Sequence, residues 1–191
     1  MRQPLFFAAI VKFNIGKWLI LYSIMEPIVN KVAESGIISL DLETFFSKDP
    51  IMVFDLKDYL FMGLILKEKD FRAALLTTDW EKYKESYVAV TCSADAIIPM
   101  WANMLVAVYL TPIVKGVYFG TEAYVKEQLL LNALDTINVT DFTEQRVVVK
   151  GCGEDPVPAS AYVKITTLLR PYAKSIMYGE PCSTVPLYKK K

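Results

Sequence analysis

The sequence contains no histidine. This absence excludes Ser-His-Asp and Cys-His catalysis, imidazole metal ligands and imidazole proton shuttles. A general base would have to be a carboxylate, a lysine, a tyrosine or a thiolate. A metal ion would have to be held by cysteine, aspartate, glutamate or backbone oxygen.

The chain also lacks a net charge, because 21 lysines and arginines balance 21 aspartates and glutamates. A nucleic-acid-binding protein usually has a basic surplus, so this class is disfavoured. Neither the G-x-G-x-x-G pattern of dinucleotide sites nor the G-x-x-x-x-G-K-[ST] pattern of P-loops occurs. The sequence therefore offers no standard phosphate-binding motif.

Cysteine is scarce, with three residues in 191 and no C-x-x-C pair. A thioredoxin-type motif and a zinc ribbon are thereby excluded. A secreted disulfide scaffold is disfavoured at this size and composition, so we expect a reducing, cytoplasmic compartment. The three thiols are then free for chemistry or for metal binding.

Residues 1–24 are apolar and aromatic and allow three interpretations. The favoured one is a non-native extension from a gene that starts at Met25, followed by a short helix that Gly36 ends. The others are an apolar interfacial or membrane helix, interrupted by Lys12 and Lys17, and a signal peptide. For residues 25–191 we expect no membrane association.

The rest of the chain predicts an α/β fold. Residues 25–86 read as a small α+β region of short strands followed by helices. From Tyr87 to residue 191, four strand-like runs start about 30 residues apart and alternate with helical patterns. This pattern predicts a parallel or mixed sheet with helices on both faces, in one compact domain with residues 25–86. The order typical of such folds is 2-1-3-4 for these four strands.

The cysteines follow three of the four strands. Cys92 and Cys152 end the first and third, and Cys182 lies just beyond the fourth. In the order 2-1-3-4 these strands are neighbours, and adjacent strands lie about 4.8 Å apart. Three thiols would then meet within about 10 Å at the carboxyl edge of the sheet, where ligands bind in parallel sheets. The alternative is that free cysteines are simply small buried side chains.

Three functions suit such a group of thiols. The first is a zinc site or an iron–sulfur cluster, with Asp95, Glu180, Glu154 or Asp155 as a candidate fourth ligand. The second is thiol chemistry, either sulfur transfer or a redox reaction. The third is a non-catalytic interaction module whose cysteines are structural. The sequence does not decide whether the protein is an enzyme, and it does not indicate an oligomeric state.

Five stretches resemble one bacterial family, domain of unknown function 2480. They are IVNKVAESGIISLDLETFF, FDLKDYLFMGLILKEKDFR, YVAVTCSADAIIPMWANML, VVVKGC and AKSIMYGEPCSTVPLYK. The resemblance spans about residues 25–190, which supports the start at Met25. It assigns no activity and no catalytic residue. It does imply a link to iron–sulfur assembly of the sulfur-mobilisation type, with partner proteins from that process, so that the cysteines would handle iron, a cluster or transferred sulfur.

Overall fold

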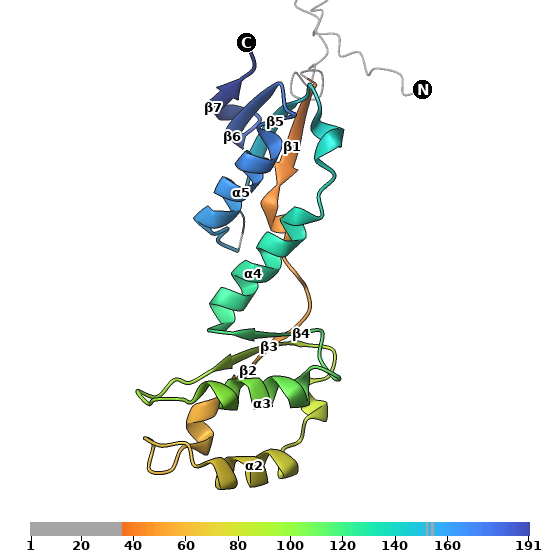
Figure 1. Cartoon of the computed structure of the whole chain (residues 1–191). Helices are drawn as coiled ribbons and strands as arrows, with labels where there is room; N and C mark the ends of the chain where they lie inside the picture. The colour runs from red at the N-terminus through yellow and green to blue at the C-terminus, as the bar shows by residue number, and fades with distance from the viewer. Residues whose placement is uncertain (1–35, 152, 154) are drawn as a thin grey trace, which may run out of the picture. The chain divides into compact units, whose positions relative to one another are not determined.

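The structure is a computed structural model that describes residues 36–151, 153 and 155–191. Within these residues, seven strands form two sheets (Figure 1). Sheet A has four strands in the order β1-β5-β6-β7, and sheet B has three in the order β2-β3-β4. The strands are β1 (Ile37–Asp41), β2 (Ile51–Asp55), β3 (Tyr87–Thr91), β4 (Gly116–Phe119), β5 (Arg146–Lys150), β6 (Ser175–Glu180) and β7 (Ser183–Lys189).

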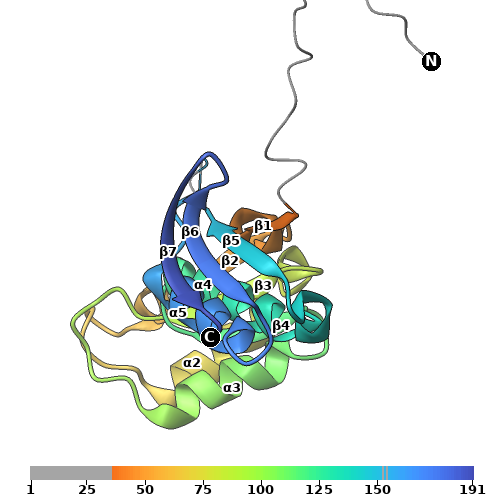
Figure 2. The ribbon, with the colours of Figure 1, turned by 90° about the horizontal axis from the view of Figure 1, so that it is seen from above.

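Neighbouring strands are parallel in both sheets, except that β7 runs antiparallel to β6. Glu180 pairs with Ser183, so β6 and β7 form a hairpin with a two-residue turn (Figure 2). The carboxyl ends of β1, β5 and β6 therefore lie along one edge of sheet A. The carboxyl ends of β2, β3 and β4 lie along one edge of sheet B.

Helices and single turns connect the strands. The α-helices of the described residues are α2 (Glu68–Thr77), α3 (Met100–Leu110), α4 (Glu122–Asp135) and α5 (Ala159–Leu169). The 3-10 turns are η1 (Leu42–Phe45), η2 (Leu56–Tyr59), η3 (Glu81–Tyr83) and η4 (Val139–Phe142). A proline stands two residues after the last residue of both α3 and α5, where it prevents the helix from continuing.

Sheet B has a helix on each face. Val88 and Val90 of β3 pack against α3, in a core that includes Ala102, Val106 and Leu110. Ala89, between those valines, packs against Val125 and Leu129 of α4. Successive residues of a strand point to opposite faces, so α3 and α4 cover opposite sides of the sheet.

Helix α4 also belongs to the core of sheet A. Its residues Leu130 and Leu134 pack with Val147 and Val149 of β5 and with Ile165 of α5. One helix therefore contributes to the cores of both sheets, and residues 36–191 form one compact unit.

These findings confirm the α/β class with mostly parallel strands. The single sheet with strand order 2-1-3-4 was wrong, because the four strands after Tyr87 are divided between sheets. The reason is that β1 and β2, which lie in the region predicted as a small α+β part, join the sheets of the later strands. Strand β2 pairs with β3, and β1 pairs with β5, so each later βαβ unit extends a different earlier strand.

The described residues form two halves, one around each sheet, in which the same types of element follow in the same order. The B half is β2, η2, α2, η3, β3, α3 and β4. The A half is β1, η1, α4, η4, β5, α5 and β6, with β7 added. Corresponding residues between η3 and the end of β4 are 59 positions apart, as from Pro99 to Pro158, which directly precede α3 and α5.

Backbone details repeat at the same interval. Glu85 and Glu144 have φ of 56° and 55°, and Gly120 and Gly179 also have positive φ. The Glu85 N–H donates to the Ile113 carbonyl, and the Glu144 N–H donates to the Tyr172 carbonyl. The buried side chains repeat too, in pairs that include Ala102 and Ala161, Val106 and Ile165, and Leu110 and Leu169. The described chain is therefore an internal duplication, in which the B half is inserted between η1 and α4 of the A half.

The remaining predictions concern the N-terminal segment and membrane association. Residues 1–24, the proposed boundary at residue 25 and the helix expected before Gly36 lie outside the described residues. Among residues 36–151, 153 and 155–191, no helix has both the length and the apolar character needed to span a bilayer.

Candidate functional site

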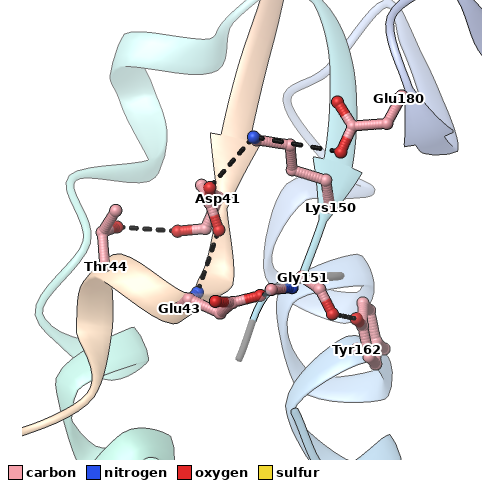
Figure 3. A network of polar contacts seen from close by, with 8 residues as sticks. Asp41, Glu43, Thr44, Lys150, Gly151, Tyr162 and Glu180 are labelled. Carbon is pink, nitrogen blue, oxygen red and sulfur yellow. Dashed lines mark hydrogen bonds and ion pairs between the residues drawn. The ribbon is translucent and has the colours of Figure 1, made fainter. Parts of the chain in front are cut away.

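The carboxyl edge of sheet A gathers charged side chains from three adjacent strand ends (Figure 3). Lys150, the last residue of β5, places its Nζ 3.1 Å from Asp41 Oδ2 at the end of β1. The same Nζ is 3.9 Å from Glu180 Oε1 at the end of β6. The Asp41 carboxylate also caps η1, because its Oδ1 accepts from the Glu43 N–H at 3.1 Å. One ammonium group thus links two carboxylates across the edge.

This arrangement raises the pKa of Lys150. The hydrogen bond and the charge of Asp41 are the main causes, and Glu180 adds to them, while desolvation opposes the shift. The three side chains are partly exposed, so the ion pairs contribute little stability by themselves. Their role is to fix a position, because they hold the Lys150 ammonium group at one place on the edge of sheet A.

The loop after β5 is held by two further contacts. The Gly153 N–H donates to the Glu43 carboxylate. The Tyr162 hydroxyl of α5 donates to the Gly151 carbonyl at 2.9 Å (Figure 3). The Tyr162 ring meets the ring of Tyr178 of β6 edge-on, with 5.6 Å between the ring centroids. A side chain at position 151 would put its Cβ 2.6 Å from the Tyr162 hydroxyl and 2.8 Å from Val157 Cγ2, so these side chains would have to move to accept it. The backbone on both sides of position 152 is therefore anchored.

Cys182 is exposed in the turn between β6 and β7. Cys152 and Glu154 lie outside the described residues. The described neighbours of Cys152 follow β5, which is adjacent and parallel to β6. Two of the three cysteines are thus attached to neighbouring strands of sheet A.

Cys92 belongs to the other sheet, where it follows β3. Its neighbour Ser93 donates its backbone N–H to Asp55 Oδ1 at 3.0 Å, and the Lys57 N–H donates to the same oxygen at 3.0 Å. Burial raises the pKa of Asp55, but hydrogen bonds from Ser93 and Lys57 and the charge of Lys57 outweigh it and leave the pKa below its ordinary value. Asp55 therefore anchors the carboxyl edge of sheet B in its ionised form.

A cavity of about 290 Å³ lies at this second edge. Cys92, Thr91, Asn103 and Phe119 line it, together with Leu56, Ile98, Met100 and two alanines. The Cys92 thiol is half-buried and donates to the Ala94 carbonyl at 3.6 Å. Asn103 Oδ1 is buried and has no hydrogen-bond partner, the one such side-chain atom in the described part of the chain.

The sequence analysis missed Asp41, Glu43, Lys150, Tyr162 and Asn103. A signal for the edge residues exists, because both Asp41-Leu42 and Asp55-Leu56 follow an apolar run and precede an aromatic residue. A comparison of the sequence with itself, shifted by 59 positions, would also have aligned Asn103 with Tyr162. No signal of composition or spacing identified Asn103 as a residue with an unpaired buried oxygen.

The predicted ligands do not share one edge, because the shared sheet on which their convergence depended does not form. Asp95 is exposed, and the first residue before α3 is Pro99, so Asp95 does not cap that helix. Asp155 forms an ion pair with Lys126 at 2.7 Å, and Glu180 pairs with Lys150. Within the described ranges, no three Cys, Asp or Glu residues are placed to hold a metal ion. The ligand set that includes Cys152 stays a prediction.

Comparison with known proteins gives one match. The family described as "Protein of unknown function (DUF2480)" matches residues 26–190, which is most of the chain. No curated protein and no solved structure matches. The chain belongs to the DUF2480 family.

Proposed function

We propose that this member of the DUF2480 family is a metal- or iron–sulfur-binding accessory protein of a reducing, cytoplasmic compartment. We assign Cys152 and Cys182 as its thiolate ligands and Glu180 as a carboxylate ligand. This set of ligands is smaller than the set expected from the sequence, because Cys92 and Asp95 are left out. The proposal also includes partner proteins from iron–sulfur assembly, and only the family resemblance supports this part.

The observation that carries the proposal is the adjacency of β5 and β6. Cys182 follows β6, and Gly151 and Gly153, the described neighbours of Cys152, follow β5. Adjacent parallel strands lie about 4.8 Å apart, which suits two ligands of one metal ion. Zinc and iron both accept thiolate together with carboxylate ligands.

The charges around this edge support a cation. Asp41, Glu43 and Glu180 supply three carboxylates, and Lys150 supplies one ammonium group (Figure 3). A metal ion bound through Glu180 would displace the long contact of 3.9 Å between Glu180 and Lys150. Lys150 would keep its shorter contact with Asp41, so the edge would retain its order.

The test is the metal content of protein purified without oxygen. Zinc, iron and acid-labile sulfide are measured in the wild-type protein and in the Cys152→Ser, Cys182→Ser and Cys92→Ser variants. We expect near-stoichiometric metal in the wild type, its loss in the first two variants and its retention in Cys92→Ser. Cys92→Ser is a matched control because Cys92 follows the corresponding strand of the other half.

Wild-type protein free of metal would overturn the proposal, as would loss of metal only in Cys92→Ser. A second function then has a specific observation in its favour, namely the exposed thiol of Cys182 in its two-residue turn. The Cys182 thiolate would attack the terminal sulfur of a donor persulfide, R–S–SH, and the donor thiolate would leave. Mass spectrometry would detect one added sulfur atom on Cys182 after incubation with such a donor.

A further inference from the structure

We infer that the outer side of α3 is the contact surface between two copies of this chain, related by a two-fold axis that passes near Met104. The inference goes beyond the proposed metal site, which belongs to sheet A, and does not depend on it. It rests on the apolar surface that α3 exposes, on the absence of charge around this helix and on the corresponding helix of the other half.

Helix α3 buries one side and exposes an apolar row on the other. Val106 and Leu110 are fully buried in the core of sheet B. Met100, Met104 and Val108 are spaced four residues apart, so they form one row along the helix. Their exposed fractions are 73%, 68% and 70%. Figure 2 shows α3 at the lower margin of the ribbon, with this helix at the outside of the B half.

Two further side chains enlarge this row into a patch. Phe119 of β4 lines the same cavity as Met100 and is 68% exposed. Ile97, three residues before α3, is 92% exposed. Together with the row on α3, they expose on the order of 700 Å² of surface, more than the 300–600 Å² of the largest apolar patch on a typical monomer and close to the 800 Å² that each partner buries in a standard interface. The area therefore suits a stable dimer.

The charge pattern favours a second copy over a different partner. No aspartate, glutamate, lysine or arginine occurs from Ala96 to Val114. Interfaces between identical chains are more apolar than those of transient complexes, and charged residues are depleted at their centres. Two uncharged helices also bring no like charges together when they meet. The surface thus has the composition of a homodimer interface.

The other half shows that the fold does not require this row. The corresponding positions of α5 are also exposed, and they hold Ala159, Val163 and Thr167. A smaller or more polar side chain is therefore compatible with the packing of such a half. Methionine is a flexible apolar side chain that adapts to an irregular partner surface. The large apolar side chains on α3 are thus best explained by a contact outside the chain.

The spacing of the row also suits contact with itself. A row of residues four apart is a ridge that packs into the matching groove of a second helix, with the two axes about 50° apart. In a two-fold arrangement the same patch is used by both copies. Met104 at the centre then meets Met104 of the second copy, and Met100 lies next to Val108 of the second copy. Ala107, beside the row, is small and lets the helices approach closely.

The test is the molar mass of the full chain in solution, measured by sedimentation velocity in a reducing buffer over a wide range of concentration. We expect the wild type to have twice the chain mass of 21.6 kDa. Met104→Lys should raise the dissociation constant of the dimer about a hundredfold, because two like charges would face each other at the axis. Val163→Lys, at the corresponding position of α5, is the matched control. Both residues are 68% exposed, so both variants should keep the fold, as checked by thermal unfolding.

A mixture of two variants tests the position of the axis. Met104→Glu alone should dissociate the dimer as Met104→Lys does. An equal mixture of the two should restore the dimer, because opposite charges then meet at the axis. A monomeric wild-type protein would overturn the inference and assign the surface to a different protein. A dimer that survives Met104→Lys, equal dissociation by Val163→Lys, or no recovery in the mixture would overturn it as well.

Discussion

Tyr162 and Asn103 stand at the same position of the two halves, yet only Tyr162 completes a hydrogen bond, to the Gly151 carbonyl at 2.9 Å. The Tyr162 ring also contacts Tyr178 in the A half, whereas a cavity lined by Asn103 lies at the carboxyl edge of sheet B. The carboxyl edge of sheet A carries the ion pairs of Lys150, and the carboxyl edge of sheet B carries the cavity.

The hydrogen bond to the Gly151 carbonyl predicts a measurable effect of the Tyr162 hydroxyl. Tyr162→Phe keeps the ring and its contact with Tyr178 but removes the bond to the Gly151 carbonyl. We expect the free energy of unfolding to fall by about 0.5–1.5 kcal/mol in urea denaturation. Tyr124→Phe, at an exposed position of α4, is the control and should change it little. An unchanged stability of Tyr162→Phe would show that the hydroxyl does not hold the loop.

The two halves should respond alike to the loss of a corresponding core side chain. Leu42 and Leu56 follow the Asp of β1 and β2, and both are fully buried. Leu42→Ala and Leu56→Ala should each lower the free energy of unfolding by about 2–5 kcal/mol. Leu64→Ala, at an exposed site, should change it by less than about 0.5 kcal/mol. A small effect at only one of the two leucines would contradict the equivalence of the halves.

Glu85 occupies the left-handed region, with φ of 56°. A residue other than glycine costs about 1–2 kcal/mol there. Glu85→Gly removes this cost but increases the entropy of the unfolded chain, so we expect a gain in stability of up to about 1 kcal/mol. Glu85→Val should lower stability, since a β-branched residue fits this conformation poorly. Thermal unfolding of both variants measures these changes in stability. A Glu85→Val variant more stable than the wild type would contradict the prediction.

Asp55 gives a pH dependence of stability. Its pKa in the folded protein lies below its ordinary value of 3.8, so the folded state favours the ionised form. The resulting stabilisation is complete above the unfolded pKa, at neutral pH, and is lost as pH falls below about 4 through the folded pKa. Asp55→Asn cannot ionise. It should therefore be less stable than the wild type at pH 7, and the difference should shrink towards pH 3, as measured by urea denaturation at each pH.

Lys150 should oppose any cation at the edge of sheet A. Lys150→Gln removes the positive charge next to Asp41 and Glu180 while keeping a polar side chain. If a metal ion binds through Glu180, this variant should bind zinc more tightly than the wild type, by up to about tenfold at low salt. Lys115→Gln, whose partner Asp49 lies elsewhere, is the matched control. Equal zinc affinity of both variants would argue against a site that includes Glu180.

The sequence predicted local structure well and long-range pairing poorly. The apolar runs located β3, β4, β5 and β6. Consecutive residues of β3, β5 and β6 are buried, as expected for parallel strands that are covered on both faces. The order of these strands depended on which earlier strand each βαβ unit joined. Ile37–Asp41 and Ile51–Asp55 have similar patterns, so periodicity could not assign one to each sheet.

The same limit applied to the sites. The positions of Cys92 and Cys182 next to strand ends followed from the sequence, since cysteines among turn residues indicate loops. Whether they share an edge depended on the strand order, which was wrong. A cavity is lined by Asn103, which corresponds to Tyr162 in the other half, and no sequence pattern indicated it.

The insertion of one half into the other has a consequence for synthesis on the ribosome. Strand β1 emerges before β2, but its partner β5 begins only at Arg146. At translation rates of about 5–20 residues per second, the edge of β1 stays unpaired for on the order of ten seconds. All strands of the B half are contiguous from Ile51 to Phe119 and can pair first. A chain that stalls between β4 and β5 would thus expose β1 to other nascent chains, and chaperone capture is expected at that stage.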